Sequence, residues 1–126
     1  IKSGSFNWEN KINSNIRPKL IGDIILSISL EGYLILIDKK NGNIIRTTDI
    51  FKNFKPKKRD KIKPSGFVMG LDKIYLSTNN GRLLVIDISS GKTIKTLKID
   101  NEKISRPYVS KQNLFIIKDN AIIRLN

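Results

Sequence analysis

The sequence of 126 residues predicts an all-β protein built from a repeated unit, and two near-copies of one stretch are the main evidence. "GYLILIDKKNGNII" occupies residues 32–45, and "GRLLVIDISSGKTI" occupies residues 81–94, 49 positions later. Each copy has an apolar run of strand-forming residues, a short polar loop with a glycine, and a second apolar run. This order is typical of a β-hairpin. No segment keeps the 3.6-residue periodicity of a helix over a useful length.

Size and composition limit the classes of function. A chain of 126 residues that is 39% hydrophobic can form one domain with a packed core. The sequence contains neither cysteine nor histidine, which excludes thiol chemistry, Cys/His zinc sites and nucleophiles activated by imidazole. No stretch approaches the roughly 20 apolar residues that span a bilayer. We therefore expect no catalytic residue, no metal ligand and no cofactor.

The hairpin loops are marked by an aspartate and a glycine in each copy. Asp38 and Asp87 end the first apolar run, and Gly42 and Gly91 close the loop. Aspartate at a turn can accept hydrogen bonds from free backbone N–H groups, and glycine adopts the left-handed conformation that a bulged type I turn needs. We interpret these four residues as structural turn residues.

Further strands flank the hairpins. Residues 23–29 and 72–78 match at the same spacing, Pro18 and Pro64 lie upstream of them, and a shorter apolar pattern follows Pro107. Proline suits the first residue of a strand or an edge. The repeated unit therefore has four short strands. The predicted units are a blade at residues 17–51, a second blade at residues 64–100 and an incomplete last blade at residues 106–126.

The apolar runs "LILI" and "LLVI" favour one arrangement of these sheets. A two-layer sandwich, which remains the alternative, exposes one face of each sheet and therefore alternates apolar and polar residues. Strands that are apolar on both faces fit sheets stacked face to face, as in a β-propeller. Repeats of about 40 residues with four strands fit the same architecture. We predict a β-propeller fragment of about three four-stranded antiparallel blades.

One motif connects the repeat with a known family. The run from Asp38 to Arg46 and the run from Asp87 to Lys95 follow the pattern Asp-x-x-(Thr/Ser/Asn)-Gly-x-x-x-Trp, except at the last position. This pattern resembles the tryptophan-docking motif of the PQQ-like, or quinoprotein-type, β-propeller repeat. Both copies have a basic residue in place of the tryptophan.

The N-terminal residues keep the same motif in phase. Gly4 and Trp8 stand in the pattern Ser-Gly-x-x-x-Trp, and Gly42 follows Gly4 by 38 residues. The resemblance therefore implies that residues 1–12 are the last strand of a preceding blade, with Gly4 in its turn and Trp8 as a blade-docking residue. It also implies that the chain is the C-terminal part of a longer propeller.

An insertion separates the first two blades. The spacing from Gly42 to Gly91 is longer than an ordinary repeat by about 11 residues, and "KNFKPKKRDKIK" at residues 52–63 holds seven basic residues and one aspartate. Such a run is expected to project from the blade as a polar loop. Lys57, Lys58 and Arg59 are the best candidates for docking an acidic protein surface, and a solvated insertion without a partner is the alternative.

The resemblance leads to two lineages with different functions. Quinoprotein dehydrogenases bind pyrroloquinoline quinone and calcium, but this sequence lacks the cysteine pair, the stacking tryptophan and the acidic cluster of such a site. The BamB family consists of non-catalytic periplasmic lipoproteins that act as scaffolds in outer-membrane β-barrel assembly. Similarity to that family implies a barrel-assembly subunit as partner, no small-molecule substrate, an outer-membrane-associated periplasmic location, and a membrane attachment only through an upstream lipid anchor.

Two further interpretations stay open. The net charge of +13 could serve an anionic partner such as nucleic acid, or it could reflect composition bias and a solvated lysine-rich surface. Aromatic residues make up only 7% of the chain, whereas nucleic-acid surfaces interleave aromatic and basic side chains. The chain could also be a PQQ-like repeat protein of another function. Exposed sheet edges predict self-association by strand pairing.

Overall fold

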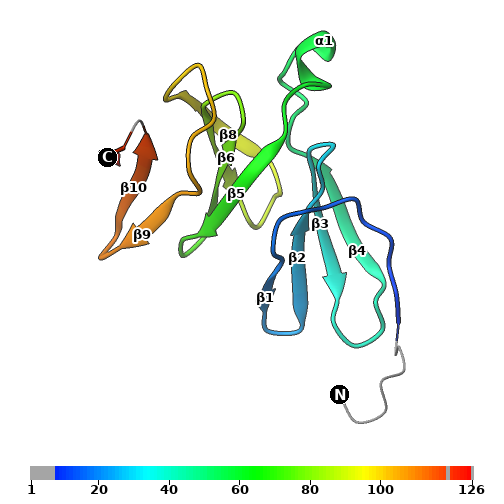
Figure 1. Cartoon of the computed structure of the whole chain (residues 1–126). Helices are drawn as coiled ribbons and strands as arrows, with labels where there is room; N and C mark the ends of the chain where they lie inside the picture. The colour runs from blue at the N-terminus through cyan, green and yellow to red at the C-terminus, as the bar shows by residue number, and fades with distance from the viewer. Residues whose placement is uncertain (1–7, 119, 126) are drawn as a thin grey trace.

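The computed structural model describes residues 8–118 and 120–125, and it contains three antiparallel sheets that stand side by side (Figure 1). The first sheet has the order β1-β2-β3-β4, the second β5-β6-β7-β8 and the third β11-β10-β9. The strands are β1 (Lys19–Ile21), β2 (Ile24–Ile28), β3 (Tyr33–Asp38), β4 (Ile44–Asp49), β5 (Pro64–Met69), β6 (Lys73–Thr78), β7 (Arg82–Asp87), β8 (Thr93–Lys98), β9 (Tyr108–Ser110), β10 (Asn113–Lys118) and β11 (Ala121–Leu125). One short helix, α1 (Pro56–Arg59), lies between β4 and β5. The predicted all-β class is confirmed.

The two predicted hairpins, β3–β4 and β7–β8, have the same geometry. The register between the strands shifts at Ile37 in the first hairpin and at Ile86 in the second. Gly42 and Gly91 have φ angles of 76° and 72°, a conformation that costs glycine little and other residues more. The turn interpretation of both glycines therefore agrees with the backbone.

The main core lies between the first and second sheets, and it contains apolar residues from both. Its buried members are Leu26, Ile28, Leu34, Ile50, Phe51, Ile62, Phe67, Ile74, Leu76, Leu84 and Ile86. Consecutive residues of one strand are buried on opposite faces, since Leu34 is 1% and Ile35 8% exposed. The stacking of sheets that the apolar runs predict is therefore present, and a two-layer sandwich is excluded.

A smaller core joins the second sheet to the third. Leu83, Ile104 and Ile116 are its buried members, and partly buried side chains such as Tyr75 and Leu97 pack around them. Leu83 and Leu84 thus point into different cores although they are neighbours in β7. The middle sheet is covered on both faces, as a blade inside a propeller is.

The predicted strand at residues 1–12 is only partly within the described residues. Gly4 and the other residues before Trp8 lie outside them. Residues 8–12 pair with none of the three sheets, and the preceding blade to which they are assigned is not among the described residues, so their assignment to a strand stays a prediction. A strand needs a neighbour that accepts and donates its backbone hydrogen bonds. Within the described residues the segment contacts the first sheet through side chains, with Trp8 and Asn10 at the first hairpin turn.

Candidate docking surface

The insertion between β4 and β5 stands at one end of the first two sheets, where α1 is its tip (Figure 1). Pro56 occupies the first helical turn, a position that its fixed φ angle favours. Lys57 and Lys58 follow within the helix, and both are exposed. The structure thus places two of the three predicted docking residues on one outward-facing turn.

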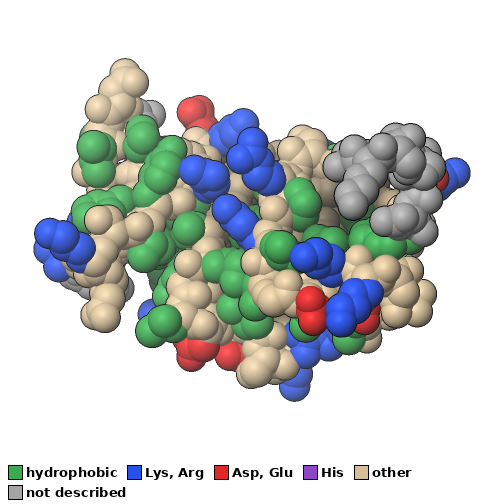
Figure 2. Space-filling model, turned by 90° about the horizontal axis from the view of Figure 1, so that it is seen from below, with side chains coloured by type: hydrophobic (Ala, Val, Ile, Leu, Met, Phe, Trp, Pro, Cys, Tyr) green, Lys and Arg blue, Asp and Glu red, His purple; other side chains and the backbone are tan. Residues whose placement is uncertain are grey.

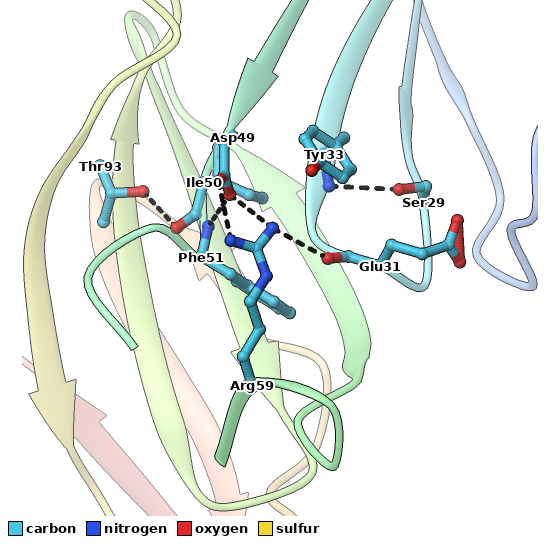
Figure 3. Close-up of polar contacts among 8 residues, drawn as sticks. All are labelled: Ser29, Glu31, Tyr33, Asp49, Ile50, Phe51, Arg59 and Thr93. Atoms are coloured by element: carbon cyan, nitrogen blue, oxygen red, sulfur yellow. Dashed lines mark hydrogen bonds and ion pairs between the residues drawn. The ribbon is translucent and has the colours of Figure 1, made fainter. Parts of the chain in front are cut away.

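Arg59, the third predicted docking residue, points back toward the first sheet (Figure 3). Its two terminal nitrogens donate hydrogen bonds to the two carboxylate oxygens of Asp49, each at 2.7 Å. Nη2 also donates to the carbonyl oxygen of Glu31 at 3.2 Å, and the guanidinium lies 5.4 Å from the centre of the Tyr33 ring. The hydrogen bonds to Asp49 raise the pKa of Arg59 above its ordinary value. Arg59 therefore anchors the insertion.

Both ends of the insertion are packed as well. Phe51 is fully buried, and the ring of Phe54 meets it edge to face at a centroid distance of 5.3 Å. At the other end Ile62, only 4% exposed, joins the main core. The insertion stands out from the end of the sheets, but it is not polar throughout, because Phe54 and Ile62 pack on the main core. Two apolar side chains and one bidentate ion pair fix it, because burying Phe54 and Ile62 and pairing Arg59 all lower the free energy of this conformation.

The backbone beside this anchor also connects the first two sheets. The carboxylate of Asp49 accepts a further hydrogen bond from the N–H of Phe51 at 3.0 Å. The hydroxyl of Thr93 in β8 donates to the carbonyl oxygen of Ile50 at 2.9 Å, as Figure 3 shows. The insertion therefore starts from a point that is fixed to both sheets.

The outward side of the insertion carries a basic surface, defined here as the exposed Lys55, Lys57, Lys58 and Lys61. Beside it lies a shallow cavity of about 280 Å³, which α1, the β6–β7 turn and the loop after β8 enclose. Its lining residues are Lys58, Lys61, Ile62, Asn79, Asn80 and Asn101. Ammonium and amide groups around an apolar floor suit carboxylate groups of a protein partner.

The tryptophan-docking motif lies away from the insertion, at the contact between consecutive repeats. Trp8 Nε1 donates to the carbonyl oxygen of Lys39 at 2.8 Å, and a Cβ on Gly42 would overlap the indole ring. Arg46 Nη2 donates in the same way to the carbonyl oxygen of Ile88, 49 residues after Lys39, at 2.8 Å. Arg46 thus makes the same hydrogen bond to the next repeat that Trp8 makes with its indole N–H. Sequence reasoning missed this role, although the position of Arg46 in the motif was the available signal.

The two turn aspartates accept different hydrogen bonds. Asp38 accepts one from the N–H of Lys40 at 2.8 Å. Asp87 accepts one from the hydroxyl of Ser89 at 2.7 Å and another from the N–H of Ser90 at 3.0 Å. These bonds from Ser89 and Ser90 lower the pKa of Asp87 to about 2. Both aspartates cap their own turn, which is a structural use of the side chain.

In residues 8–118 and 120–125, no group of three or more His, Cys, Asp and Glu side chains is arranged to hold a metal ion. No helix in this part of the chain has the length and apolar character needed to cross a membrane.

A scan against protein-family models and a search of curated proteins gave no match. Solved structures do match. BamB from Moraxella catarrhalis superposes with a TM-score of 0.67 over 90% of this chain and 31% of that protein, at 11% identity. This chain has a β-propeller fold. The likeness to BamB agrees with the PQQ-like repeat identified in the sequence.

Two other neighbours show how widely the fold is used. The β-propeller domain of Cps50 (Swd1) from Myceliophteria thermophila has a TM-score of 0.61 and 19% identity over 77% of this chain and 32% of that one. Quinohemoprotein alcohol dehydrogenase from Comamonas testosteroni has a TM-score of 0.61 and 22% identity over 80% of this chain and 16% of that one. The chain spans a third or less of these proteins. Since different functions share the fold, the fold alone does not determine the function.

Proposed function

We propose that this protein is a non-catalytic β-propeller scaffold that binds an acidic protein surface through its basic insertion. The fold likeness to BamB and the sequence resemblance to that family support outer-membrane β-barrel assembly as the process and a barrel-assembly subunit as the partner. A periplasmic location at the outer membrane, with a lipid anchor upstream, belongs to the same proposal.

The observation that carries the proposal is the anchoring of the insertion by Arg59. A loop held by a bidentate pair to Asp49 and by a buried Ile62 loses little conformational freedom when a partner binds. Lys57 and Lys58 are then presented from a fixed turn. Their positive charges speed the encounter with an acidic surface and help to select the partner. They contribute less to the final binding affinity.

A protein partner fits this end of the molecule better than nucleic acid does. Binding to single strands uses aromatic rings on which bases stack. Near the basic surface Phe51 is buried and Phe54 packs against it. The guanidinium of Arg59 lies over the ring of Tyr33. These three rings are committed to contacts within the protein.

The proposal is tested by affinity capture from the cell envelope with the full-length protein. We expect the native protein to retain the barrel-forming subunit and the double variant Lys57→Glu/Lys58→Glu to lose it. The matched control is Lys95→Glu/Lys98→Glu, which reverses two exposed lysines of β8 and leaves capture unchanged. Equal capture by both double variants would refute docking through the insertion. Capture of nucleic acid alone would favour the anion-binding interpretation.

A further inference from the structure

Two cavities border the basic insertion, one against each neighbouring turn. The β6–β7 cavity, which lies between the insertion and the β6–β7 turn, has a volume of about 280 Å³. The β2–β3 cavity, which lies between the insertion and the β2–β3 turn, has a volume of about 240 Å³. Its lining residues are Glu31, Tyr33, Arg59, Asp60 and Lys63. An acidic partner that meets the tip of the insertion therefore has two sides on which it can bind.

The two cavities differ in charge. The lining of the β6–β7 cavity includes the exposed Lys58 and Lys61 and, among the described residues, no acidic side chain. The lining of the β2–β3 cavity includes the acidic Glu31 and Asp60. One of its two basic residues, Arg59, already donates to a carboxylate of the first sheet (Figure 3). A carboxylate of a partner is therefore attracted to the β6–β7 cavity, since like charges brought together at an interface cost free energy.

Asparagine side chains add hydrogen-bond donors to the β6–β7 cavity. Asn79 is engaged within the protein, because its Oδ1 accepts from the N–H of Lys63 at 2.9 Å and its Nδ2 donates to the carbonyl oxygen of Lys61 at 3.0 Å. These two bonds join the end of the insertion to the β6–β7 turn. In the part of the chain that the structure describes, the Nδ2 groups of Asn80 and Asn101 donate no hydrogen bond. Both amides can therefore donate to a carboxylate oxygen of a partner.

The opposite end of the sheets offers an acidic segment less. Figure 2 shows that end, where acidic and basic side chains lie among hydrophobic ones. A cavity of about 630 Å³ lies there between the second and third sheets. Its lining includes Asp72 and, within the described residues, no lysine or arginine. An acidic segment therefore finds no basic group in that cavity, and charge complementarity favours the end that carries α1.

The size of the β6–β7 cavity indicates what kind of group it takes. Pockets for small molecules typically have roughly 300–1,000 Å³. With about 280 Å³, the β6–β7 cavity suits one or two side chains rather than a whole small molecule. The floor includes the apolar Ile62, which can contact the methylene groups of a glutamate.

We propose that the partner presents an extended acidic segment that crosses the β6–β7 side of the insertion and places a carboxylate in the β6–β7 cavity. Lys58 and Lys61 supply the positive charge there, and Asn80 and Asn101 donate hydrogen bonds to the carboxylate. This inference rests on the proposed function and deepens it, because it names the form of the partner, the side of the insertion and the residues that select the segment.

Fluorescence anisotropy of a labelled octaglutamate peptide with the full-length protein tests the placement. The double variant Lys61→Gln/Asn101→Asp alters two lining residues of the β6–β7 cavity. It should raise the dissociation constant of the peptide at least about tenfold, because it removes one attraction and adds one repulsion. No binding of octaglutamate to the native protein would overturn the inference, as would tighter binding of an oligothymidylate of the same length.

The matched control is Lys63→Gln/Asn53→Asp. It changes the net charge of the protein by the same amount, also at exposed residues, but outside the β6–β7 cavity. We expect the dissociation constant to rise less than about threefold, because only the general charge attraction is weakened. An equal or larger rise in the control would show that the peptide is not held in the β6–β7 cavity.

NMR titration of the native protein with octaglutamate locates the peptide without any substitution. The amide signals of Asn79, Asn80 and Asn101 should shift, because these residues line the β6–β7 cavity. Those of Glu31 and Tyr33, which line the β2–β3 cavity, should stay in place. Shifts at Glu31 and Tyr33 without shifts at the three asparagines would overturn the placement.

Affinity capture separates this inference from the proposed function. We expect Lys61→Gln/Asn101→Asp to lose most of the captured barrel-forming subunit, as Lys57→Glu/Lys58→Glu does. Full capture by Lys61→Gln/Asn101→Asp together with loss in Lys57→Glu/Lys58→Glu would refute the placement in the β6–β7 cavity and leave docking through the insertion intact.

Discussion

The two interfaces between sheets have the same design but different strength. Between the first and second sheets, Arg46 donates to the carbonyl oxygens of Ile88 and Ser89, and a large apolar core lies beneath. Between the second and third sheets, the equivalent Lys95 is exposed, and the buried core has three residues. One repeat pattern therefore does not by itself determine how firmly two sheets are joined.

Connecting segments account for much of the difference. The chain around the basic insertion adds Ile50, Phe51 and Ile62 to the first core, whereas the chain between β8 and β9 adds only Ile104 to the second. Fewer buried apolar contacts favour local opening. We expect the first two sheets to unfold together and the third to open more readily.

The largest effect is expected from Phe51→Ala. This change leaves a cavity in the first core and should lower the free energy of unfolding by about 3–5 kcal/mol. Urea denaturation followed by the fluorescence of Trp8, the one tryptophan of the chain, reports the loss, since Trp8 contacts the first hairpin turn. A loss below about 1 kcal/mol would contradict the importance given to this interface.

Substitutions at the last position of the motif in the two repeats test the difference between the two interfaces. Arg46→Ala removes two charged hydrogen bonds to the next turn and should cost about 1–3 kcal/mol. Lys95→Ala, at the equivalent position of the next repeat, should stay within about 0.5 kcal/mol of the native protein. Thermal unfolding of both variants measures the difference. Equal losses of stability would mean that Arg46 and Lys95 stabilise their two interfaces to the same extent.

The substitution Arg59→Lys tests whether the ion pair between Arg59 and Asp49 holds the insertion in place. Lysine keeps the charge but cannot form both hydrogen bonds to Asp49, so we expect a loss of about 1 kcal/mol. Trypsin should cleave faster after Lys57 and Lys58, because the insertion then opens more often. Lys52→Ala, an exposed change in the same insertion, is the control. Unchanged cleavage would show that Arg59 does not hold the insertion.

The smallest effect concerns pH. The pKa of Asp87 is about 2 in the folded chain and lies near 3.8 ordinarily. A lowered pKa means that the folded state favours the ionised carboxylate. The stabilising contribution is therefore complete above pH 3.8 and is lost as pH falls through about 2. An NMR titration of the carboxyl carbon measures this, and a midpoint near the ordinary value would contradict the role of Ser89 and Ser90.

Local patterns made the strands predictable. The apolar runs of β3 and β7, the turn glycines Gly42 and Gly91, and the proline that begins β5 each act on neighbouring residues, so their effect can be read along the chain. The packing of β3 and β7 on both faces follows from the same runs.

The site was less predictable because its contacts join distant residues. Arg59 is one basic residue among seven in the insertion, and only the fold brings it to Asp49 and Tyr33. Ile62 is an isolated apolar residue between Lys61 and Lys63, and such a position gives no periodic signal for burial. Arg46 departs from the family motif, so comparison with the motif marks it as a loss although it donates to the next turn.

Hydrogen exchange followed by mass spectrometry tests whether the first two sheets are joined more firmly to each other than the three-stranded third sheet is joined to the second. The amides of β2 and β6 should exchange slowly and at similar rates in dilute protein. Those of β10, the middle strand of the third sheet, should exchange faster by a factor of about ten or more, because fewer buried contacts hold that sheet. Exchange in β10 as slow as in β6 would show that the smaller core holds the third sheet as firmly as the main core holds the first two.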